Sequence, residues 1–504
     1  MSTSDQESAV SVQTAPKAKH PRGLYTLFFT EMWERCSYYG MRALLILFMV
    51  DVVEKGGLGL NDRTAGAIYG LYTACVYLAA LPGGWMADRL LGAQRSIWYG
   101  GLIIAAGHFT LAIPTTETFF LGLLFVIAGT GLLKPNISAI VGELYPEGGA
   151  RRDAGFSIFY MGINLGAFIG PLVCSTLGEK INWHYGFAAA GVGMVLGLLQ
   201  FKLTAGHLGE AGLHPHRKRT GAAEGIDRGW YLVAAGLAVV VLLVVLGLTR
   251  VMIPNPVILA GRAKYAIAGL GGVYFAAIFL FGKLDAGETR RCAVLLILLV
   301  ASAMFWSGFE QAGSSLNLFA ERYTDRVVDA FQFEIPAGWF QALNPVYIIA
   351  LAPLFASLWV SLGRRNLDPS LPAKFALGLI LLGLGFLVMA GAAALVASHG
   401  RVLPTWLIAT YLVHTFGELC LSPVGLSAVT KLAPRRFVGQ MMGLWFLATS
   451  LGNLIAGLIA GEFSAEAGTQ MPRLFLRIVL TTAGSGLLLL IFARPIKKLM
   501  GDIR

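Results

Sequence analysis

The sequence predicts an all-α membrane protein whose helices cross the bilayer many times. Hydrophobic residues make up 56% of the 504-residue chain and charged residues only 13%, against about 25% in ordinary globular proteins. The apolar residues form long runs that extend to the roughly 20 residues a spanning helix needs. These runs are too long and continuous for the alternating strands of a membrane β-barrel. A soluble fold is therefore excluded.

Glycines, prolines and clusters of charge divide the apolar runs into about fourteen predicted spans. These spans cover residues 24–51, 64–91, 96–115, 118–143, 154–178, 185–204, 229–250, 258–282, 292–320, 337–362, 372–398, 404–432, 437–461 and 473–494. An even number of spans returns the C-terminus to the side of the membrane on which the chain begins.

The net charge of +11 follows the positive-inside pattern of membrane proteins. With the N-terminus inside, roughly 25 Lys and Arg residues fall in the inner loops and tails and about 11 in the outer ones. We therefore expect a multi-pass protein of the inner (cytoplasmic) membrane with both termini in the cytoplasm, and the lipid bilayer as a partner, with no nucleic acid. The densest inner patches are Arg217–Arg219, Arg290 with Arg291, Arg364 with Arg365, Arg435 with Arg436, and Lys497 with Lys498.

The predicted spans form two six-helix halves. The expected parts are a disordered tail at 1–22, halves at 23–205 and 284–495, a cytoplasmic loop at 206–228, two inserted helices within 229–283, and a tail at 496–504. Gly83–Arg95 and Leu354–Asn366 occupy similar places in the halves and indicate an internal repeat. The first segment resembles the loop signature of the major facilitator superfamily, which implies that fold and a pairing among Asp88, Arg89 and Arg95. Two such halves imply alternating access by rocking.

The first predicted span carries a stripe of charge. On a helix that advances 100° per residue, Glu31, Glu34, Arg35, Tyr38 and Arg42 fall within about 100° of one another. Each charge costs at least about 2.5 to 3.5 kcal/mol at the centre of a spanning helix unless it is paired or hydrated. A single charge at a helix end can snorkel to the interface, but four on one stripe indicate a functional site.

Three more ionisable residues lie deep within predicted spans. Lys134 needs a carboxylate, an anion or water, and we expect Glu310 to be its partner. Glu418 has no cation near it in the sequence, which indicates a site for an amine or a proton. Burial favours the neutral form of a carboxyl group and a neighbouring cation favours its charged form, so Glu31, Glu34 and Glu310 are the best candidates for proton carriers.

Three polar residues precede prolines inside predicted spans. They are Lys134–Pro135, Asn344–Pro345 and Ser422–Pro423. A proline removes a backbone donor and loosens the helix, so these pairs are candidate hinges, although a proline that only kinks a packed helix is an equal alternative for each.

The sequence lacks the motifs of metal sites, nucleotide-binding loops and enzyme active sites. His108, His184, His399 and His414 lack the spacing of metal ligands, and no G-x-x-x-x-G-K-[ST] loop occurs. Cys36, Cys75, Cys174, Cys292 and Cys420 form no CxxC pair. Since no Ser/His, metal or paired-Asp constellation is present either, we expect no catalytic residue, no metal site and no cofactor besides protons as the coupling ion.

Motifs spread over nearly the whole membrane domain resemble the bacterial type of the proton-dependent oligopeptide transporter (POT/PTR) family. Glu31–Gly40 reads EMWERCSYYG, similar to the family's ExxERFxYYG signature, with Cys36 in place of the usual Phe. The further motifs are GTGLLKPNIS (129–138), FYMGINLGAFIGP (159–171), FWSGFEQ (305–311), QALNPVYI (341–348) and GELCLSPVGLS (417–427). Bacterial members have twelve core helices and two inserted ones, which agrees with the predicted spans.

The resemblance implies uptake of di- and tripeptides together with protons. It implies that the peptide carboxylate meets Arg42 and Lys134, that its ammonium meets Glu418, and that two asparagines hydrogen-bond nearby. A zwitterion needs a cation at one end of its site and a carboxylate at the other, which the two halves supply. The other predicted peptide-binding residues are Tyr38, Tyr39, Tyr72, Asn164, Trp306, Asn344, Ser422 and Trp445, although an aromatic residue on a spanning helix is more often a packing residue.

The predicted proton-coupling residues are Glu31, Glu34, Arg35, Lys134 and Glu310. Protonation of Glu31 and Glu34 would free Arg35, while proton and peptide at Lys134 and Glu310 would break a bridge that holds one access state.

The nearest alternative function is that of a transporter of the same superfamily for nitrate, drugs or other small organic anions, which has less need of Glu418. Paired halves and proline-flanked charges argue against a channel. We expect the chain to function as a monomer.

Overall fold

The computed structural model describes residues 19–147, 149–215, 227–249, 251, 254–463 and 470–501. Most of the predicted tail at 1–22 lies outside the described residues. So do residues 216–226 of the predicted loop at 206–228, which include Arg217–Arg219, and the last three residues of the predicted tail at 496–504.

Every predicted span has a helix at its place. The bounds agree within a few residues except at 292–320, which is divided, and at 337–362, whose first six residues form a 3-10 turn. The helices are α1 (Arg22–Val50), α2 (Asp62–Met86), α3 (Ala93–Leu111), α4 (Thr116–Glu143), α5 (Gly149–Lys180), α6 (Trp183–Thr204), α8 (Gly229–Leu248), α9 (Pro256–Phe281), α10 (Ala286–Phe309), α11 (Ser315–Tyr323), α12 (Leu343–Arg364), α13 (Leu371–His399), α14 (Thr405–Leu432), α15 (Val438–Ala460), α16 (Met471–Ile491) and the short α17 (Ala493–Leu499). The all-α membrane fold of the major facilitator type is confirmed.

Short elements fill the connections between these helices. They are the 3-10 turns η1 (Val53–Lys55), η3 (Ala205–Leu208), η4 (Glu310–Gly313), η5 (Asp329–Phe331), η6 (Ala337–Ala342) and η7 (Arg435–Phe437), and the π-helical turn η2 (Ala87–Leu91).

Among the described residues, twelve helical stretches are long and apolar enough to cross a membrane. The helices α1 and α3 are not among them. In α1 the reason is its buried charge, since Glu31, Glu34, Arg35 and Arg42 all lie in its middle. The composition that disqualifies α1 as an apolar span is thus the feature that marks it as functional.

The structure differs from the sequence prediction in two connections. The predicted span at 292–320 is not one helix: α10 ends at Phe309, η4 carries Glu310, and α11 begins at Ser315. A two-stranded antiparallel hairpin, β1 (Val327–Val328) and β2 (Phe333–Glu334), lies between α11 and η6, with Val327 opposite Glu334. Both differences arise where polar residues interrupt the hydropathy on which the span prediction rests.

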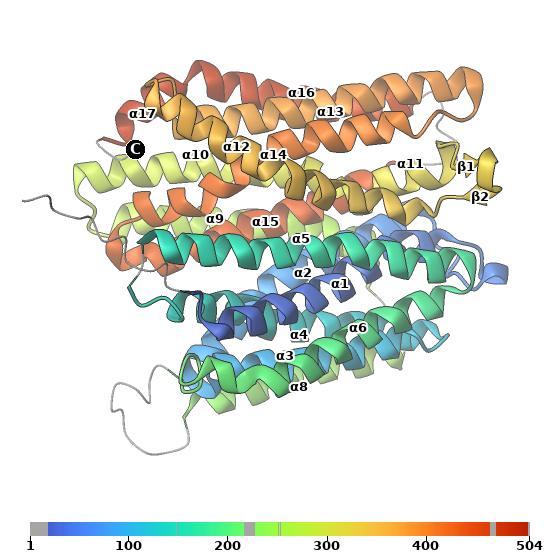
Figure 1. Ribbon diagram of the computed structural model, residues 1–504, viewed down its shortest axis with the longest axis horizontal. Coiled ribbons are helices and arrows are strands. Elements are labelled where there is room, and N and C mark those ends of the chain that lie inside the picture. Colours follow the sequence, from blue (N-terminus) through green and yellow to red (C-terminus); the bar gives the residue numbers. More distant parts are fainter. Residues whose placement is uncertain are drawn as a thin grey trace, which may run out of the picture.

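Each half packs as a bundle (Figure 1). In the N-terminal half α1 packs on α5 and α6, and α4 packs on α3 and α2. In the C-terminal half α13 packs on α14 and α16, and α10 packs on α15. The start of α1 and the C-terminal α17 lie at the same end of the bundle, on the left in Figure 1. This end is called the Arg22 end below, and the opposite one the Asp62 end.

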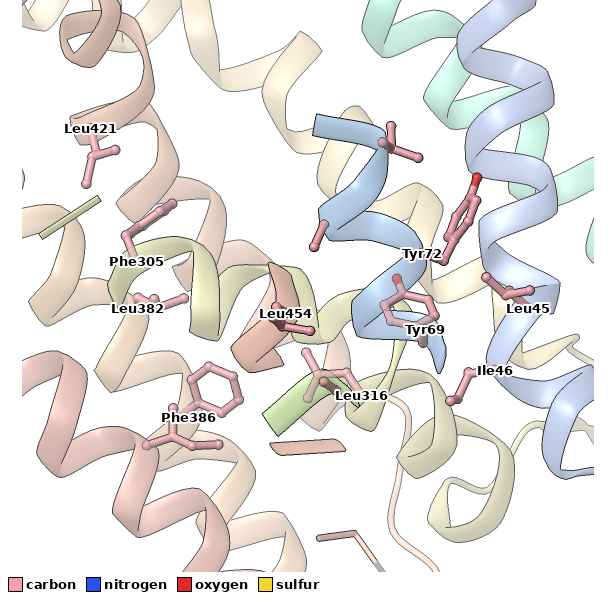
Figure 2. Close-up of a cluster of buried hydrophobic side chains, with 14 of the residues drawn as sticks. Leu45, Ile46, Tyr69, Tyr72, Phe305, Leu316, Leu382, Phe386, Leu421 and Leu454 are labelled. Atoms are coloured by element: carbon pink, nitrogen blue, oxygen red, sulfur yellow. The ribbon is translucent and has the colours of Figure 1, made fainter. Parts of the chain in front are cut away.

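The two halves meet along α2 and α15, where glycines allow close approach. A Cβ on Gly70 of α2 would lie 2.9 Å from the carbonyl oxygen of Leu454 on α15 and 3.1 Å from the Cα of Gly457. Small residues at such positions let helix backbones approach within van der Waals distance in a membrane. Figure 2 shows Tyr69 and Tyr72 of α2 between the side chains of α1 and those of Leu316 and Leu454, all buried in one apolar core.

The inserted helices α8 and α9 differ in their packing. One stripe of α9, which includes Ile267 and Phe275, is buried against α2 and α15. In contrast, α8 is exposed along nearly its whole length, although it is among the most apolar of the described spans. We conclude that α8 faces lipid on nearly all sides.

Polar contacts between the halves seal the Asp62 end. Arg322 of α11 donates two hydrogen bonds of 2.8 Å to the carboxylate of Asp62 on α2. Glu179 of α5 accepts from the backbone N–H groups of Ala337, at 2.6 Å, and Gly338, at 2.9 Å. These contacts join α2 and α5 of one half to α11 and η6 of the other.

Candidate functional site

The charged stripe of α1 folds into a buried cluster. Arg35 Nε lies 2.6 Å from Glu31 Oε1 and 3.1 Å from Glu34 Oε2. All three side chains are buried, with Glu34 fully so. Among the described residues neither oxygen of Glu34, nor Oε2 of Glu31, receives a hydrogen bond. Two carboxylates therefore share one guanidinium, and their unsatisfied oxygens provide a place for a proton.

Arg42, two turns further along α1, forms an ion pair with the other half of the molecule. Its Nη1 lies 2.9 Å from Glu310 Oε2, and both side chains are buried. The guanidinium also lies 5.3 Å from the centre of the Tyr39 ring. The prediction that Glu310 pairs with Lys134 is therefore wrong in this conformation. Glu310 lies in η4, at the break between α10 and α11, where its carboxylate meets Arg42.

Lys134 of α4 is half-buried and stands over an aromatic ring. Its Nζ lies 3.9 Å from the centre of the Tyr77 ring, which is a cation–π contact. No carboxylate of the described residues forms an ion pair with it, although Glu34 and Glu31 are close enough to interact with its charge. Tyr77 lies outside the motifs that predict the site, so no motif indicated it. Lys134 is thus a cation still available to an anionic ligand.

Glu418 of α14 is held by an amide group. Asn344 Nδ2 donates to Glu418 Oε2 at 2.9 Å and also lies 3.0 Å from Thr415 Oγ1. Glu418 and Asn344 are both half-buried, and within the described chain no cation pairs with Glu418. The structure therefore brings together two residues from separate predicted motifs and leaves one carboxylate charge uncompensated.

The other predicted peptide-binding residues are in varied surroundings. Asn164 donates to the carbonyl of Tyr160 on its own helix, at 2.9 Å. Tyr38 packs edge-on against Tyr39, with ring centres 5.3 Å apart. The indole N–H of Trp306 and the hydroxyls of Tyr72 and Ser422 are buried without a described partner, and Trp445 packs edge-on against Phe375. Tyr72 and Trp445 are almost fully buried.

Two of the three predicted hinges lie inside helices. Pro135 lies within α4 and Pro423 within α14, and both helices continue past the proline. Pro345 lies in the first turn of α12, directly after the 3-10 turn η6. A hinge role for each of the three pairs stays a prediction. The proline inside α12 is Pro353.

Arg89 of the superfamily's loop signature forms an ion pair that the sequence did not predict. Arg89 Nε lies 3.0 Å from Asp227, just before α8. Arg89 lies in the turn after α2, and Asp227 lies in the segment that leads into the inserted helices. Among the described residues no group of three or more His, Cys, Asp and Glu side chains could hold a metal, and all five cysteines are free.

Lys134 and Glu418 lie in the interiors of α4 and α14, and Asn344 lies in the first turn of α12. All three remain partly accessible to water. Tyr160 on α5, close enough to Glu418 to interact with its charge, is 40% exposed. Since contacts between the halves seal the Asp62 end, we infer that water reaches these residues from the Arg22 end. A cation of one half and a carboxylate of the other thus share an accessible interior.

The chain matches the model of the POT family over residues 94–218 and 262–473, and the stretch between these ranges holds α8. It is 45% identical to a peptide transporter of Yersinia enterocolitica over 499 residues, 96% of each chain. It is 39% identical to a di-/tripeptide transporter of Lactococcus lactis over 494 residues, which cover 96% of this chain and 97% of the relative. A crystal structure of a peptide transporter in complex with sulfate matches with a TM-score of 0.87 at 42% identity, over 96% of this chain and 97% of that one.

Proposed function

Because the chain belongs to the POT family, we propose that this multi-pass membrane protein is a proton-coupled symporter that imports di- and tripeptides by alternating access. We place it in the cytoplasmic (inner) membrane with both termini in the cytoplasm, acting as a monomer with protons as its only coupling ion. Relatives named as peptide and di-/tripeptide transporters over nearly their full length support the substrate class.

One observation carries the substrate assignment: the accessible interior has opposite charges on opposite halves. Lys134 of the N-terminal half has no carboxylate in ion-pair distance within the described chain, and Glu418 of the C-terminal half has no cation. A short peptide is a zwitterion whose carboxylate and ammonium match this polarity. Binding then draws the two halves toward each other, because the ligand bridges them.

The proton assignment rests on the excess of buried carboxylate. Glu31 and Glu34 share Arg35, and one proton on the pair would balance the cluster. A peptide carboxylate at Lys134 would draw that lysine away from Glu34, which favours proton uptake by the pair. Substrate and proton therefore bind cooperatively in this scheme.

The Arg42–Glu310 pair links proton binding to access. It joins α1 to η4 close to the sealed end. A proton on Glu310 removes the ionic attraction and weakens the closure of the Asp62 end. The driving force is adequate, since an inward proton gains about 2.3 kcal/mol per 100 mV and about 1.4 kcal/mol per unit of pH gradient.

The test is uptake of labelled dialanine into proteoliposomes with and without an imposed proton gradient. We expect gradient-dependent accumulation, a loss of at least tenfold for Lys134→Ala, and a similar loss for Glu418→Gln, because each removes one ionic contact with the ligand. Exposed residues supply matched controls: Lys55→Ala and Glu117→Gln remove the same charges at the Asp62 end and leave uptake unchanged. Uptake that ignores both the gradient and the two site variants contradicts the proposal.

A further inference from the structure

A basic pocket lies at the Arg22 end of the bundle, away from the interior site. Its volume is about 400 Å³, and it is lined by Glu288, Arg291, Lys431, Ala433, Pro434, Arg435 and Arg436. The lining comes from the first turns of α10, the last turn of α14, and η7 at the start of α15. This volume is within the range of small-ligand sites. Four cationic side chains face one carboxylate.

That carboxylate is already engaged within the wall of the pocket. Arg436 Nη2 donates to Glu288 Oε2 at 2.7 Å and to the carbonyl oxygens of Gly282 and Lys283, at 3.1 and 3.0 Å. Arg436 thus fastens the α9–α10 connection to η7. Arg291 and Arg435 make no ion pair with any residue in the described part of the chain. The pocket therefore keeps an excess of positive charge.

The location of the pocket selects the kind of anion. α10, α14 and α15 are membrane spans, and the pocket sits where the first two begin and end. A ligand at this depth lies among lipid headgroups. Arginine forks match the geometry of phosphate oxygens, and basic pockets between spanning helices favour anionic headgroups. We propose that this pocket binds the phosphate group of an anionic phospholipid.

Such a lipid would join parts of a single half. Its phosphate would bridge Arg291 of α10 and Arg435 of η7, adding to the clamp that Arg436 makes. Binding would stabilise the C-terminal half at the Arg22 end without linking it to the other half. The expected effect is a rise in thermal stability that depends on headgroup charge and not on peptide.

The test uses the full-length protein in detergent, titrated with phosphatidylglycerol or phosphatidylcholine and followed by native mass spectrometry and thermal unfolding. We expect retention of phosphatidylglycerol over phosphatidylcholine and a higher midpoint with the anionic lipid. Arg291→Gln combined with Arg435→Gln lowers the affinity for phosphatidylglycerol roughly 10- to 30-fold. Arg364→Gln with Arg365→Gln, which removes two exposed arginines at the end of α12, leaves it unchanged.

Three results separate this site from the alternatives. Equal binding of phosphatidylglycerol by the wild type and the Arg291→Gln/Arg435→Gln variant overturns the proposal. Stabilisation by inorganic phosphate that matches that by phosphatidylglycerol also overturns it, because the pocket would then serve a soluble anion. Should the double variant fail to fold, Ala433→Glu places a carboxylate in the lining while both arginines remain, and undiminished lipid binding by that variant contradicts the proposal.

Discussion

Arg42 and Glu310 form a buried ion pair that joins the two halves. Both are buried, and each is the other's only ion-pair partner among the described residues. Helical periodicity predicts that Arg42 belongs to the charged stripe of α1, and hydropathy identifies Glu310 as a charge within an apolar span. Neither signal indicates which distant helix a side chain meets. The sequence therefore predicted the members of the site but assigned Glu310 to Lys134, because pairing depends on how the halves dock.

Removal of one partner leaves a buried charge without compensation. We expect Glu310→Gln to lower the free energy of unfolding by about 3 to 5 kcal/mol. Combining it with Arg42→Gln should recover much of that loss, because neither charge then remains. Thermal unfolding of the two single variants and the double variant in detergent measures the coupling. Additive losses in the double variant contradict a direct ion pair.

At the scale of the elements, α2 and α15 form the seam along which the halves touch. The positions of both helices were predictable, because long apolar runs fix where a chain must cross a bilayer. The contact between α2 and α15 could not be predicted, because glycines in a spanning helix are also found at kinks and on surfaces that face lipid. The break between α10 and α11 was missed for a similar reason: a short polar interruption hardly changes the hydropathy of a long window.

The seam makes Gly70 intolerant of a larger side chain. A Cβ there would lie 2.9 Å from the Leu454 carbonyl oxygen, so Gly70→Ala must push α2 away from α15. We expect a loss of about 1 to 3 kcal/mol, measured as a lower midpoint of thermal unfolding. Gly236→Ala on α8 is the matched control, because no atom lies within 4 Å of its Cβ position. Equal midpoints for the two variants would rule out a tight seam.

The β1–β2 hairpin depends on one carboxylate outside the membrane. Burial alone would raise the pKa of Glu334, but the hydrogen bond from Lys180 and the charges of Arg326 and Lys180 hold the pKa below its ordinary value. Lys180 Nζ lies 3.0 Å and Arg326 Nη2 2.9 Å from this carboxylate. Because the pKa is depressed in the folded state, these contacts persist above the ordinary value and are lost as the pH falls through the folded pKa.

We therefore expect hydrogen exchange in residues 327–336, corrected for the intrinsic rate, to stay constant from neutral pH to about pH 5. Protection should fall only below about pH 4, near the unperturbed pKa of a glutamate and under it. Glu334→Gln should lack the pH-dependent step. A step at higher pH in the wild type, or the same step in the variant, contradicts the role of Glu334.

At the scale of the whole molecule, the halves are joined at the Asp62 end and water reaches the site from the other. The proposed alternating-access cycle requires that the Asp62–Arg322 contact part each time the site opens at the Asp62 end. This contact and those of Glu179 with backbone N–H groups are polar, so water can replace them when the halves separate. Such contacts hold this end closed in one state, and the free energy needed to open it is small.

A covalent link at this end should stop the cycle. In a background without native cysteines, Asp62→Cys and Arg322→Cys joined by a short bifunctional maleimide should hold the Asp62 end closed. We expect dialanine uptake to fall to background while binding of the peptide persists. Asp62→Cys alone, treated with the same reagent, is the control. Continued uptake by a quantitatively linked protein contradicts the requirement that this end opens.

The exposure of α8 has a consequence for how this chain tolerates change. A helix that touches lipid on nearly every side is constrained by its length and apolarity and hardly by the shapes of its side chains. Substitutions of one apolar residue for another should therefore accumulate there without loss of function. For protein engineering, α8 is the span to replace, tag or lengthen first.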